Sequence, residues 1–322
     1  MHFIIPVAGE GTRLRPLTHT VPKPLLYVAG KSILGHILEN LRKLPLEKIT
    51  IVHGVKGEAI IKFCKKYDYD FRFVYQEKRL GLGHAIYIGA KGLKGPTIVL
   101  LGDTIIEYDL KKLCKQTMNV LAVKKVAEPQ RFGIVETKGC YVIDLKEKPK
   151  NPKSNLAIAG LYYFQHIENI VRSVTRLMEK GLKTRGEYQL TDALRYLLHK
   201  GEKFKILRIK NWFDCGTSAA LIETNRHLLI KNHHFKKRKQ TIVLRPVYID
   251  DSAYIRNSII GPNVSIGENV TIRNSVIKDS IINRKAIVEN ALLSESIIGE
   301  KAVVKSGYKK LSVSDSSSIN LP

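Results

Sequence analysis

Residues 1–18 read MHFIIPVAGEGTRLRPLT, an apolar run followed at once by a glycine-rich loop. Phe3–Val7 is apolar throughout, which is typical of a buried strand. Glycines at positions 9 and 11 let backbone N–H groups approach phosphate oxygens, and Arg13 adds a forked cationic side chain. The stretch therefore predicts a strand that leads directly into a phosphate-binding loop.

The alternation of strands and helices continues over the next ninety residues or so of the chain. Apolar runs predict strands, and helical spacing of apolar residues predicts helices between them. The expected strands are Ile49–Val55, Phe71–Gln76 and Thr97–Leu101, and the expected helices cover 33–44, 58–66 and 83–94. Repeated β-α-β units with continuous apolar strands predict a parallel sheet covered on both faces. Ligands of such sheets bind beyond the carboxyl ends of the strands.

Two other phosphate-binding folds fit the first loop poorly. A dinucleotide-binding fold needs a third glycine where Leu14 stands. A P-loop ending in Gly30-Lys31-Ser32 needs a glycine where Leu25 stands. A tight turn without a ligand stays open as the plainer interpretation, although two arginines on one turn argue against it.

The period of the apolar residues changes past residue 240. Ile260, Ile266 and Ile272 recur every six residues, and apolar residues continue at spacings of five or six through Val304. Ser, Asn and Gly fill the positions between them. At about 18 residues per coil, residues 245–307 give three to four coils of a parallel β-helix. The pattern resembles the hexapeptide-repeat left-handed β-helix.

The charge of the chain is concentrated in its first 240 residues. The 322 residues include 54 Lys and Arg and 29 Asp and Glu. Residues 1–240 carry 44 basic and 21 acidic residues, whereas residues 241–322 carry 10 and 8. Such a field attracts polyanions, including nucleotide phosphates and nucleic acid. We interpret the basic block Lys236–Lys239 as part of a linker and do not favour a nucleic-acid partner.

Composition and cysteine spacing predict a cytoplasmic protein. The chain is 44% hydrophobic and 26% charged, which excludes a disordered or fibrous protein. Its apolar runs are shorter than the about 18 residues of a membrane span, and its N-terminus lacks the basic region of a secretory signal. Cys64, Cys114, Cys140 and Cys215 form no CxxC pair, so we expect buried, reduced thiols.

Further segments make a family recognisable. VPKPLL at 21–26 and Gly30-Lys31 follow the first loop, LLGD at 100–103 ends a strand, and WFDCGT spans 212–217. In this order they resemble the sugar-1-phosphate nucleotidyltransferases, especially the glucose-1-phosphate thymidylyl- and uridylyltransferases, over residues 1–230. The resemblance implies an α/β fold: a Rossmann-like nucleotidyltransferase domain with a mixed, mostly parallel sheet, followed by a short left-handed β-helix.

The implied reaction is attack by a sugar-1-phosphate oxygen on the α-phosphorus of an NTP, releasing pyrophosphate. By the resemblance, Arg13 would hold the departing pyrophosphate, and Lys23 would contact the phosphates from the other side. Asp103 and Asp214 match the family's metal acids and would bind Mg²⁺. The plainer interpretation is that Asp103 caps a following helix and Asp214 caps the helix that begins near Ser218.

The resemblance also implies substrate contacts. The nucleotide-binding residues would be Ala8, Gly9, Gly11, Thr12, Gln76 and Gly81. The sugar-phosphate-binding residues would be Gly133, Glu147, Lys148, Gly160 and Tyr162. Gln76 and Gly81 would read a pyrimidine, Glu147 would accept sugar hydroxyl protons, and we expect a structural role for His84. Thymine and uracil differ by one methyl group, so dTTP and UTP both stay open.

We expect a nucleotidyltransferase domain over 1–232, a basic linker over 233–244, a left-handed β-helix over 245–308 and a polar tail over 309–322. All ten histidines lie at or before His234, which argues against a β-helix acetyltransferase with a histidine base. The β-helix is therefore expected to make oligomer contacts or to pack on the nucleotidyltransferase domain, and we favour a homo-oligomer.

The sequence thus predicts a cytoplasmic, Mg²⁺-dependent enzyme that makes dTDP- or UDP-glucose from glucose-1-phosphate, with no membrane partner. One alternative is a mannose-1-phosphate guanylyltransferase, which needs a purine pocket around 76–83. Another is a non-catalytic subunit that binds a nucleotide sugar, although the presence of Arg13, Lys23, Asp103 and Asp214 argues against it. RNA binding by the basic first domain is a third.

Overall fold

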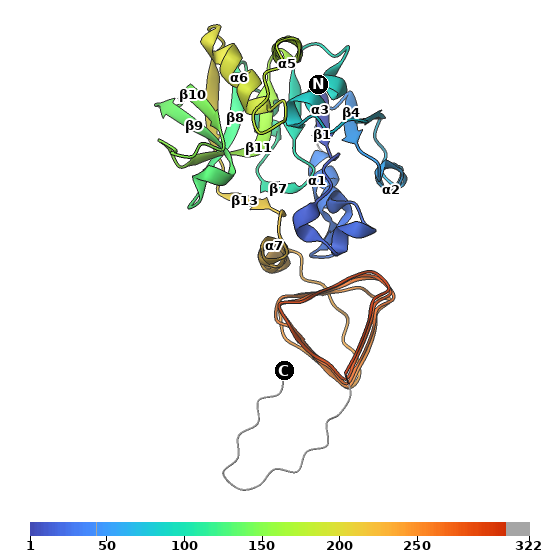
Figure 1. Ribbon diagram of the computed structural model, residues 1–322. Coiled ribbons are helices and arrows are strands. Elements are labelled where there is room, and N and C mark those ends of the chain that lie inside the picture. The colour runs from blue at the N-terminus through green and yellow to red at the C-terminus, as the bar shows by residue number, and fades with distance from the viewer. Residues whose placement is uncertain (43, 307–322) are drawn as a thin grey trace. The chain divides into compact units, whose positions relative to one another are not determined.

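The computed structural model describes residues 1–42 and 44–306. The chain forms two compact units, each shown in Figure 1. Unit 1 comprises Met1–Leu26 and Lys31–Leu221. Unit 2 comprises Tyr27–Gly30 and the chain from Ile222 onward.

Unit 1 is built on a nine-stranded sheet. Its strands lie in the order β5 (Phe71–Tyr75), β4 (Lys48–His53), β1 (His2–Pro6), β6 (Thr97–Leu100), β11 (Leu156–Phe164), β8 (Asn119–Lys125), β12 (Phe204–Arg208), β10 (Tyr141–Glu147) and β9 (Gly133–Lys138). β5, β4, β1 and β6 pair in parallel, whereas β11 and β10 run antiparallel to their neighbours. The predicted mixed, mostly parallel sheet is therefore confirmed.

Helices of unit 1 follow these strands along the chain, and several of them form the core with the sheet. They are α1 (Ile33–Leu41), α2 (Gly57–Cys64), α3 (Leu82–Ala90), α4 (Lys111–Cys114), α5 (Ile167–Glu179) and α6 (Leu190–His199). α3 contacts β1 and β4 on the sheet and also contacts α5 and α6 (Figure 1). Ile4, Val99, Phe164 and Leu194 belong to the buried cluster between these elements. Burial of such side chains is the main stabilising term of the unit.

Short elements position the loops of unit 1. The 3₁₀ turns are η1 (Thr12–Leu14), η2 (Leu17–His19), η3 (Lys23–Leu25) and η4 (Pro129–Arg131). β7 (Thr104–Glu107) and β13 (Asn211–Asp214) form a separate antiparallel pair. β3 (Lys31–Ser32) is a two-residue strand of unit 1, whereas the two-residue strand β2 (Tyr27–Val28) belongs to unit 2. Ser32 caps α1, because its Oγ accepts a 3.0 Å hydrogen bond from Gly35 N.

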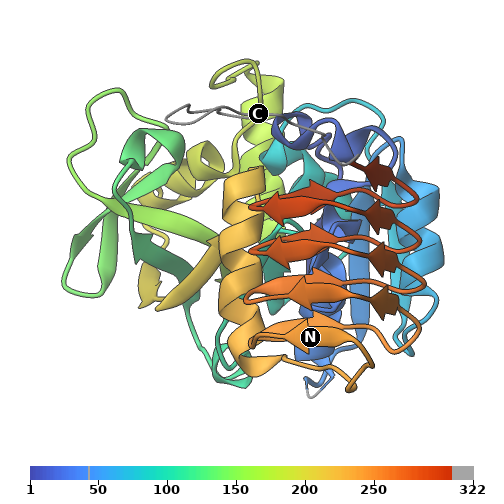
Figure 2. The same ribbon diagram turned by 90° about the horizontal axis from the view of Figure 1, so that it is seen from below.

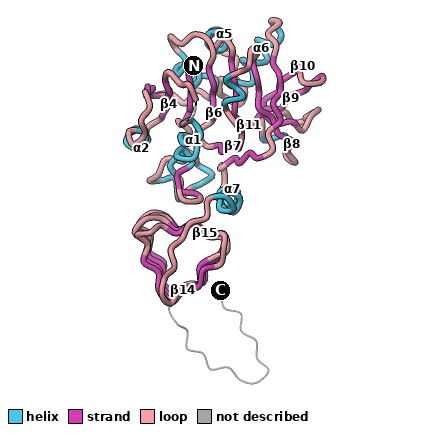
Figure 3. Tube along the Cα trace, turned by 180° about the vertical axis from the view of Figure 1, so that it is seen from behind, coloured by secondary structure: helices cyan, strands magenta, loops and turns pink. Residues whose placement is uncertain are grey.

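Unit 2 contains three four-stranded parallel sheets, and its short strands are joined into triangular coils (Figures 1 and 3). The sheets are β14 (Thr241–Val243), β17 (Ser258–Ile260), β20 (Val276–Lys278) and β23 (Leu292–Ser294); β15 (Val247–Ile249), β18 (Val264–Ile266), β21 (Ile281–Ile282) and β24 (Ile297–Ile298); and β16 (Tyr254–Arg256), β19 (Thr271–Arg273), β22 (Ile287–Glu289) and β25 (Val303–Lys305). The repeating Ile260, Ile266 and Ile272 are fully buried inside the coils. This is the left-handed β-helix that the repeat predicts.

The coils are shorter than the expected 18 or so residues. The stacked corner residues Asn257 and Asn274 are 17 residues apart, and Asn274 and Asn290 are 16 apart. The apolar spacing drops from six to five at some corners, which removes residues from each turn of the coil. All three asparagines have positive φ, between 48° and 55°, a conformation that asparagine tolerates better than most residues. Their side-chain amides also hydrogen-bond from coil to coil.

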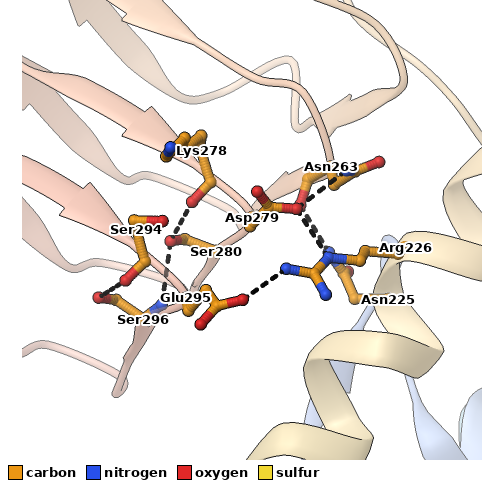
Figure 4. A network of polar contacts seen from close by, with 9 residues as sticks. All are labelled: Asn225, Arg226, Asn263, Lys278, Asp279, Ser280, Ser294, Glu295 and Ser296. Carbon is orange, nitrogen blue, oxygen red and sulfur yellow. Dashed lines mark hydrogen bonds and ion pairs between the residues drawn. The ribbon is translucent and has the colours of Figure 1, made fainter.

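α7 (Ser218–Lys231) runs along the stacked coils (Figure 2). Arg226 lies on this helix and pairs with Asp279 at 2.7 Å and with Glu295 at 2.9 Å (Figure 4). Asp279 also accepts a 2.9 Å hydrogen bond from Asn263 Nδ2. The buried Asn225 accepts a 2.6 Å hydrogen bond from Ser265 Oγ through its Oδ1. Because Asp279 and Glu295 belong to successive coils, Arg226 joins the helix to both.

The cysteines are free thiols, but only Cys64 and Cys215 are buried. Cys140 is exposed in the turn between β9 and β10, so the expectation of buried thiols is wrong there. Among residues 1–42 and 44–306, helices long and apolar enough to cross a membrane are absent. The predicted linker 233–244 includes β14, and the predicted polar tail 309–322 lies outside the described residues.

Candidate active site

The carboxyl ends of four parallel strands meet at one edge of the unit 1 sheet. The glycine-rich loop follows β1, and residues 54–56 follow β4. Gln76 follows β5, and Asp103 comes shortly after β6. Because parallel strands end at the same edge, the predicted phosphate loop, base-reading residue and metal acid lie along it.

The glycine-rich loop is held in one conformation by its neighbours. Gly11 has φ 68°, and its carbonyl accepts a 2.8 Å hydrogen bond from Thr18 Oγ1. A Cβ at Gly11 would lie 3.1 Å from Lys23 Cβ, so glycine is required for both conformation and space. A Cβ at Gly9 would have open space around it, so a ligand could approach the backbone there. Thr12 begins η1 directly after Gly11.

Lys23 is a buried cation beneath this loop. It begins η3 and stands between Pro22 and Pro24, which stiffen the backbone around it. Its side chain is only 8% exposed, and its Nζ lies 2.6 Å from Asp103 Oδ2. Lysine is rarely buried to this extent without an anionic partner. The ion pair therefore fixes the lysine beside the predicted metal acid.

Two carboxylates that are far apart in sequence come together through β7 and β13. Asp103 lies in the turn between β6 and β7, so it does not cap a helix. Asp214 ends β13 and pairs with Thr104 of β7, and Cys215 N donates to Asp103 O at 3.2 Å. Thr217 Oγ1 accepts the 3.2 Å hydrogen bond from Ala220 N at the start of α7, a capping contact that the plainer interpretation gave to Asp214.

The electrostatics of the two carboxylates are coupled. Burial raises the pKa of Asp214, and the nearby charge of Asp103 raises it further. Lys23, Arg13 and Arg131 act in the opposite direction and lower the pKa of Asp214. A Cβ built on Gly216 would lie 3.0 Å from Asp214 Oδ1 and 3.2 Å from Arg13 Nη2, so these two side chains flank that glycine. Asp103 and Asp214 thus lie among cationic side chains in a site that is partly shielded from water.

The second loop positions Gln76, Gly81 and His84. Gln76 is buried, and its Nε2 donates to Gly81 O at 3.3 Å and lies 3.0 Å from His84 Nδ1. Burial lowers the pKa of His84, so the ring is neutral at pH 7. His84 therefore orients the amide, which agrees with a structural role.

Backbone hydrogen bonds with Tyr188, which lies just before α6, stabilise this loop. Tyr188 N donates to Leu80 O at 2.7 Å, and Gly83 N donates to Tyr188 O at 2.9 Å. Gly81 has φ 105°, and a Cβ there would lie 2.8 Å from Glu187 Cβ. The loop therefore fits only with glycine at position 81.

The predicted sugar residues gather around Glu147 at the end of β10. Its carboxylate is 9% exposed, and its Oε2 accepts a 2.7 Å hydrogen bond from Thr191 Oγ1. Its Oε1 lies 3.4 Å from Lys148 Nζ. A Cβ at Gly133 would lie 3.0 Å from Glu147 Oε2, so glycine leaves room for the carboxylate. Burial, and then the charge of Glu147, raise the pKa of Tyr162, which keeps this phenol neutral.

Gly160 connects this cluster with the end of β6. It has φ 76°, and its carbonyl accepts a 2.9 Å hydrogen bond from Leu101 N, two residues before Asp103. A Cβ at Gly160 would lie 2.8 Å from Leu101 Cδ1. Gly160 and the segment that leads to Asp103 therefore lie on the adjacent strands β11 and β6.

A cavity of about 200 Å³ lies against the glycine-rich loop. Ala8 and Gly9 line it together with three cationic side chains, Arg15, Lys56 and Arg79. A larger hollow of about 690 Å³ near Lys125, Ile143 and Asn155 contains none of the predicted site residues.

Three residues near the site are not predicted by the sequence motifs: Lys56, Arg79 and Thr191. Arg79 stands between Gln76 and Gly81, so its place in the predicted base loop was the available signal. Lys56 and Thr191 have no comparable motif, because tertiary contacts alone bring them to the cavity and to Glu147.

Comparison with known proteins agrees with this geometry. The nucleotidyl transferase family model matches residues 3–231, and the GMPPB C-terminal domain model matches residues 243–314. The bifunctional protein GlmU of Methanocaldococcus jannaschii is 37% identical over 259 residues, which are 79% of this chain and 61% of that protein. This chain therefore spans less than two thirds of that relative.

Two further relatives match over most of their own length. A glucose-1-phosphate thymidylyltransferase of Streptomyces griseus is 28% identical, over 89% of this chain and 88% of that protein. A crystal structure of a UDP-glucose pyrophosphorylase complexed with UDP-glucose has a TM-score of 0.62 and 25% identity, over 71% of this chain and 98% of that one. Since the family model covers well over half of the residues, this chain belongs to the nucleotidyl transferase family.

Proposed function

We propose that this chain transfers a nucleotidyl group from an NTP to a sugar-1-phosphate, giving a nucleotide sugar and pyrophosphate. One observation carries the proposal: a glycine-rich loop, a buried lysine and two carboxylates that are far apart in sequence meet where the parallel strands end. In particular, Lys23 Nζ lies 2.6 Å from Asp103 Oδ2, and Asp103 and Arg13 both affect the pKa of Asp214. Phosphoryl chemistry of this kind depends on such charge neutralisation and positioning.

Asp103 and Asp214 fit a divalent cation with oxygen ligands. Asp214 pairs with Thr104, the residue after Asp103, and Cys215 N donates to Asp103 O at 3.2 Å, so the two acids lie close together. Mg²⁺ commonly uses one or two carboxylates and completes its shell with water and substrate phosphates. We assign Mg²⁺ to these two residues, where it would neutralise phosphate charge when bound.

The remaining steps belong to the chain's own residues. The open backbone at Gly9 and the guanidinium of Arg13 would hold the β- and γ-phosphates, and Lys23 would neutralise charge at the α-phosphate. An oxygen of the sugar phosphate forms the new bond to the α-phosphorus. The bond from the α-phosphorus to the bridging oxygen breaks, and that oxygen leaves with pyrophosphate.

Contacts in the second loop are compatible with a pyrimidine base. Gln76 uses its Nε2 within the loop, so its Oε1 can accept a hydrogen bond from the N3–H of thymine or uracil. The relatives' names point the same way, since they include a glucose-1-phosphate thymidylyltransferase and a UDP-glucose pyrophosphorylase. We therefore propose dTTP or UTP as the nucleotide and glucose-1-phosphate as the sugar phosphate.

The sugar itself would contact the cluster at the end of β10. The Glu147 carboxylate is oriented by Thr191 and can accept hydrogen bonds from sugar hydroxyls. Lys148 would pair with the sugar phosphate, and Gly133, Gly160 and Tyr162 would lie against the sugar.

Pyrophosphate release tests the proposal. Wild type is incubated with Mg²⁺, glucose-1-phosphate and dTTP, UTP, GTP, CTP or ATP in turn, alongside Asp103→Ala. Asp70→Asn is a matched control, because Asp70 is an acid of unit 1 whose side chain is 60% exposed in a surface ion pair with Lys48. We expect turnover with dTTP or UTP that Asp103→Ala loses and Asp70→Asn retains. Turnover with GTP and mannose-1-phosphate alone, or none with any pair, would contradict the substrate proposal.

We also propose that the chain is cytoplasmic, with a nucleotidyltransferase domain over 1–232 and a β-helix that forms a homo-oligomer. The outer face of one β-helix sheet supports the last point, because Ile242, Val276 and Leu292 are 59%, 39% and 84% exposed. Ile259 lies between the first two in the pairing register. Contiguous exposed apolar residues commonly mark an interface. Sedimentation equilibrium should show an oligomer that Leu292→Lys weakens, and a wild-type monomer would contradict it.

A further inference from the structure

Glu10 places a carboxylate inside the phosphate loop, where a negative charge would repel a nucleotide. It stands between Gly9 and Gly11 and forms ion pairs through both of its oxygens. Its Oε1 pairs with Arg79 Nη1, and its Oε2 lies 3.4 Å from Arg15 Nη2. The Arg79 contact, reinforced by the charges of Arg15 and Lys56, lowers the pKa of Glu10, so the carboxylate is ionised at pH 7.

The Glu10–Arg79 pair joins two loops with separate roles in the proposed function. Glu10 belongs to the phosphate loop, and Arg79 belongs to the loop between Gln76 and Gly81. Within residues 1–42 and 44–306, Glu10 is the carboxylate that pairs with Arg79 and with Arg15. Both guanidiniums and the carboxylate line the cavity of about 200 Å³.

Lys56 supplies a third cation at this cavity but is held differently. Its Nζ donates to the backbone carbonyls of Thr18 and, at 2.7 Å, of His19. These contacts fix the ammonium in place, and in the part of the chain that the structure describes its charge is not paired with a carboxylate. The cavity therefore has three cations and one acid, a balance that favours an anionic ligand.

We propose that Glu10 is an internal counter-ion that the phosphates of the substrate replace. In the free protein Glu10 forms ion pairs with Arg15 and Arg79. When a nucleoside triphosphate or pyrophosphate binds, both guanidiniums leave the carboxylate and pair with phosphate oxygens. Arg79 is thus a phosphate-binding residue supplied by the base loop, so that bound phosphates replace Glu10 as the link between the two loops. The inference rests on the proposed function, because it requires phosphates on this loop.

The exposure of the three side chains makes such an exchange favourable. Arg15, Arg79 and Glu10 are 51%, 43% and 43% exposed, so their ion pairs are solvated and weak. A triphosphate or pyrophosphate carries several negative charges and can accept bidentate hydrogen bonds from each guanidinium. Such a ligand can therefore displace the Glu10 carboxylate from the two guanidiniums. The displacement, and the repulsion between the carboxylate and the phosphates, still lower the affinity for the ligand.

Isothermal titration of inorganic pyrophosphate, at fixed Mg²⁺, tests the exchange on the full chain. Glu10→Gln removes the competing charge, so we expect pyrophosphate to bind about three- to tenfold more tightly at 0.05 M salt and the gain to shrink at 0.5 M. Arg79→Gln should bind it about five- to tenfold more weakly. In the Arg79→Gln background, Glu10→Gln should give a smaller gain, because only Arg15 is left to release. Glu179→Gln is the matched control, since it removes one exposed charge from the Arg176 pair of α5 and should leave binding unchanged.

The outcomes separate this inference from the proposed function. Wild type that turns over substrate, together with Glu10→Gln that binds pyrophosphate no more tightly than wild type, overturns the inference alone. The same holds if Arg79→Gln binds as well as wild type. Wild type that binds neither pyrophosphate nor any NTP overturns the proposed function, and the inference with it.

Discussion

Replacing Lys23 by methionine should destabilise unit 1 as well as abolish turnover. The change keeps the length of the side chain but removes a cation that is 8% exposed and lies 2.6 Å from Asp103 Oδ2. A hydrogen bond to a charged group contributes about 1.5–3 kcal/mol. Asp103 is 37% exposed, and water would partly compensate it after the change. We therefore expect a loss at the low end of that range, about 1.5–2 kcal/mol.

Urea unfolding followed by tryptophan fluorescence measures this loss for unit 1 alone. Trp212 is the one tryptophan of the sequence and lies in β13 of unit 1, so a second unit that unfolds separately does not contribute. Asp103→Asn in the Lys23→Met background should recover part of the loss, with a coupling energy of about 1 kcal/mol. Arg176→Met is the control, because its exposed pair with Glu179 should contribute no more than about 0.5 kcal/mol. Unchanged stability of Lys23→Met, or additive effects in the cycle, would refute the reasoning.

Three other substitutions test separate parts of the structure. Burial and the charge of a nearby acid raise the pKa of Asp214, so ionisation destabilises the folded state as pH rises from 3.8 through that raised pKa. Without Mg²⁺, Asp214→Asn should therefore raise Tm at pH 7 and leave it nearly unchanged near about pH 3, as thermal unfolding at both pH values would show. Gly11→Ala should cost about 1–2 kcal/mol in urea unfolding and raise the KM for NTP, because φ is 68° and Lys23 Cβ would be 3.1 Å away. Arg226→Met removes the ion pairs with Asp279 and Glu295 and should lower the calorimetric Tm of unit 2. The unfolding transition of unit 1, followed by Trp212 fluorescence, should not change.

Local patterns predicted the strands and motifs of unit 1 with small errors at their ends. The predicted strands Phe3–Val7 and Thr97–Leu101 correspond to β1 and β6. They could be predicted because parallel strands that are buried on both faces consist of continuous apolar residues. The strand expected over Ile49–Val55 ends at His53, and Val55 is 72% exposed. Hydrophobicity alone does not show where a strand leaves the sheet.

Contacts between distant segments could not be predicted in the same way. The salt bridge of Glu10 with Arg79 and the hydrogen bond from Thr191 to Glu147 depend on how loops pack, and no local spacing encodes them. The helix-cap interpretation of Asp103 failed for a related reason, because β7 follows it in place of a helix. Motif order identified the acids, whereas their proximity came only from the pairing of β7 with β13.

The most direct test of the central claim is ³¹P NMR of the wild-type chain with Mg²⁺, glucose-1-phosphate and dTTP or UTP. The proposed chemistry predicts that the triphosphate and sugar-phosphate signals fall together while a nucleotide-sugar diphosphate and pyrophosphate appear in equal amounts. Omitting glucose-1-phosphate should stop both products. Hydrolysis of the triphosphate without sugar-phosphate consumption, or unchanged spectra with every pyrimidine nucleotide, would contradict it.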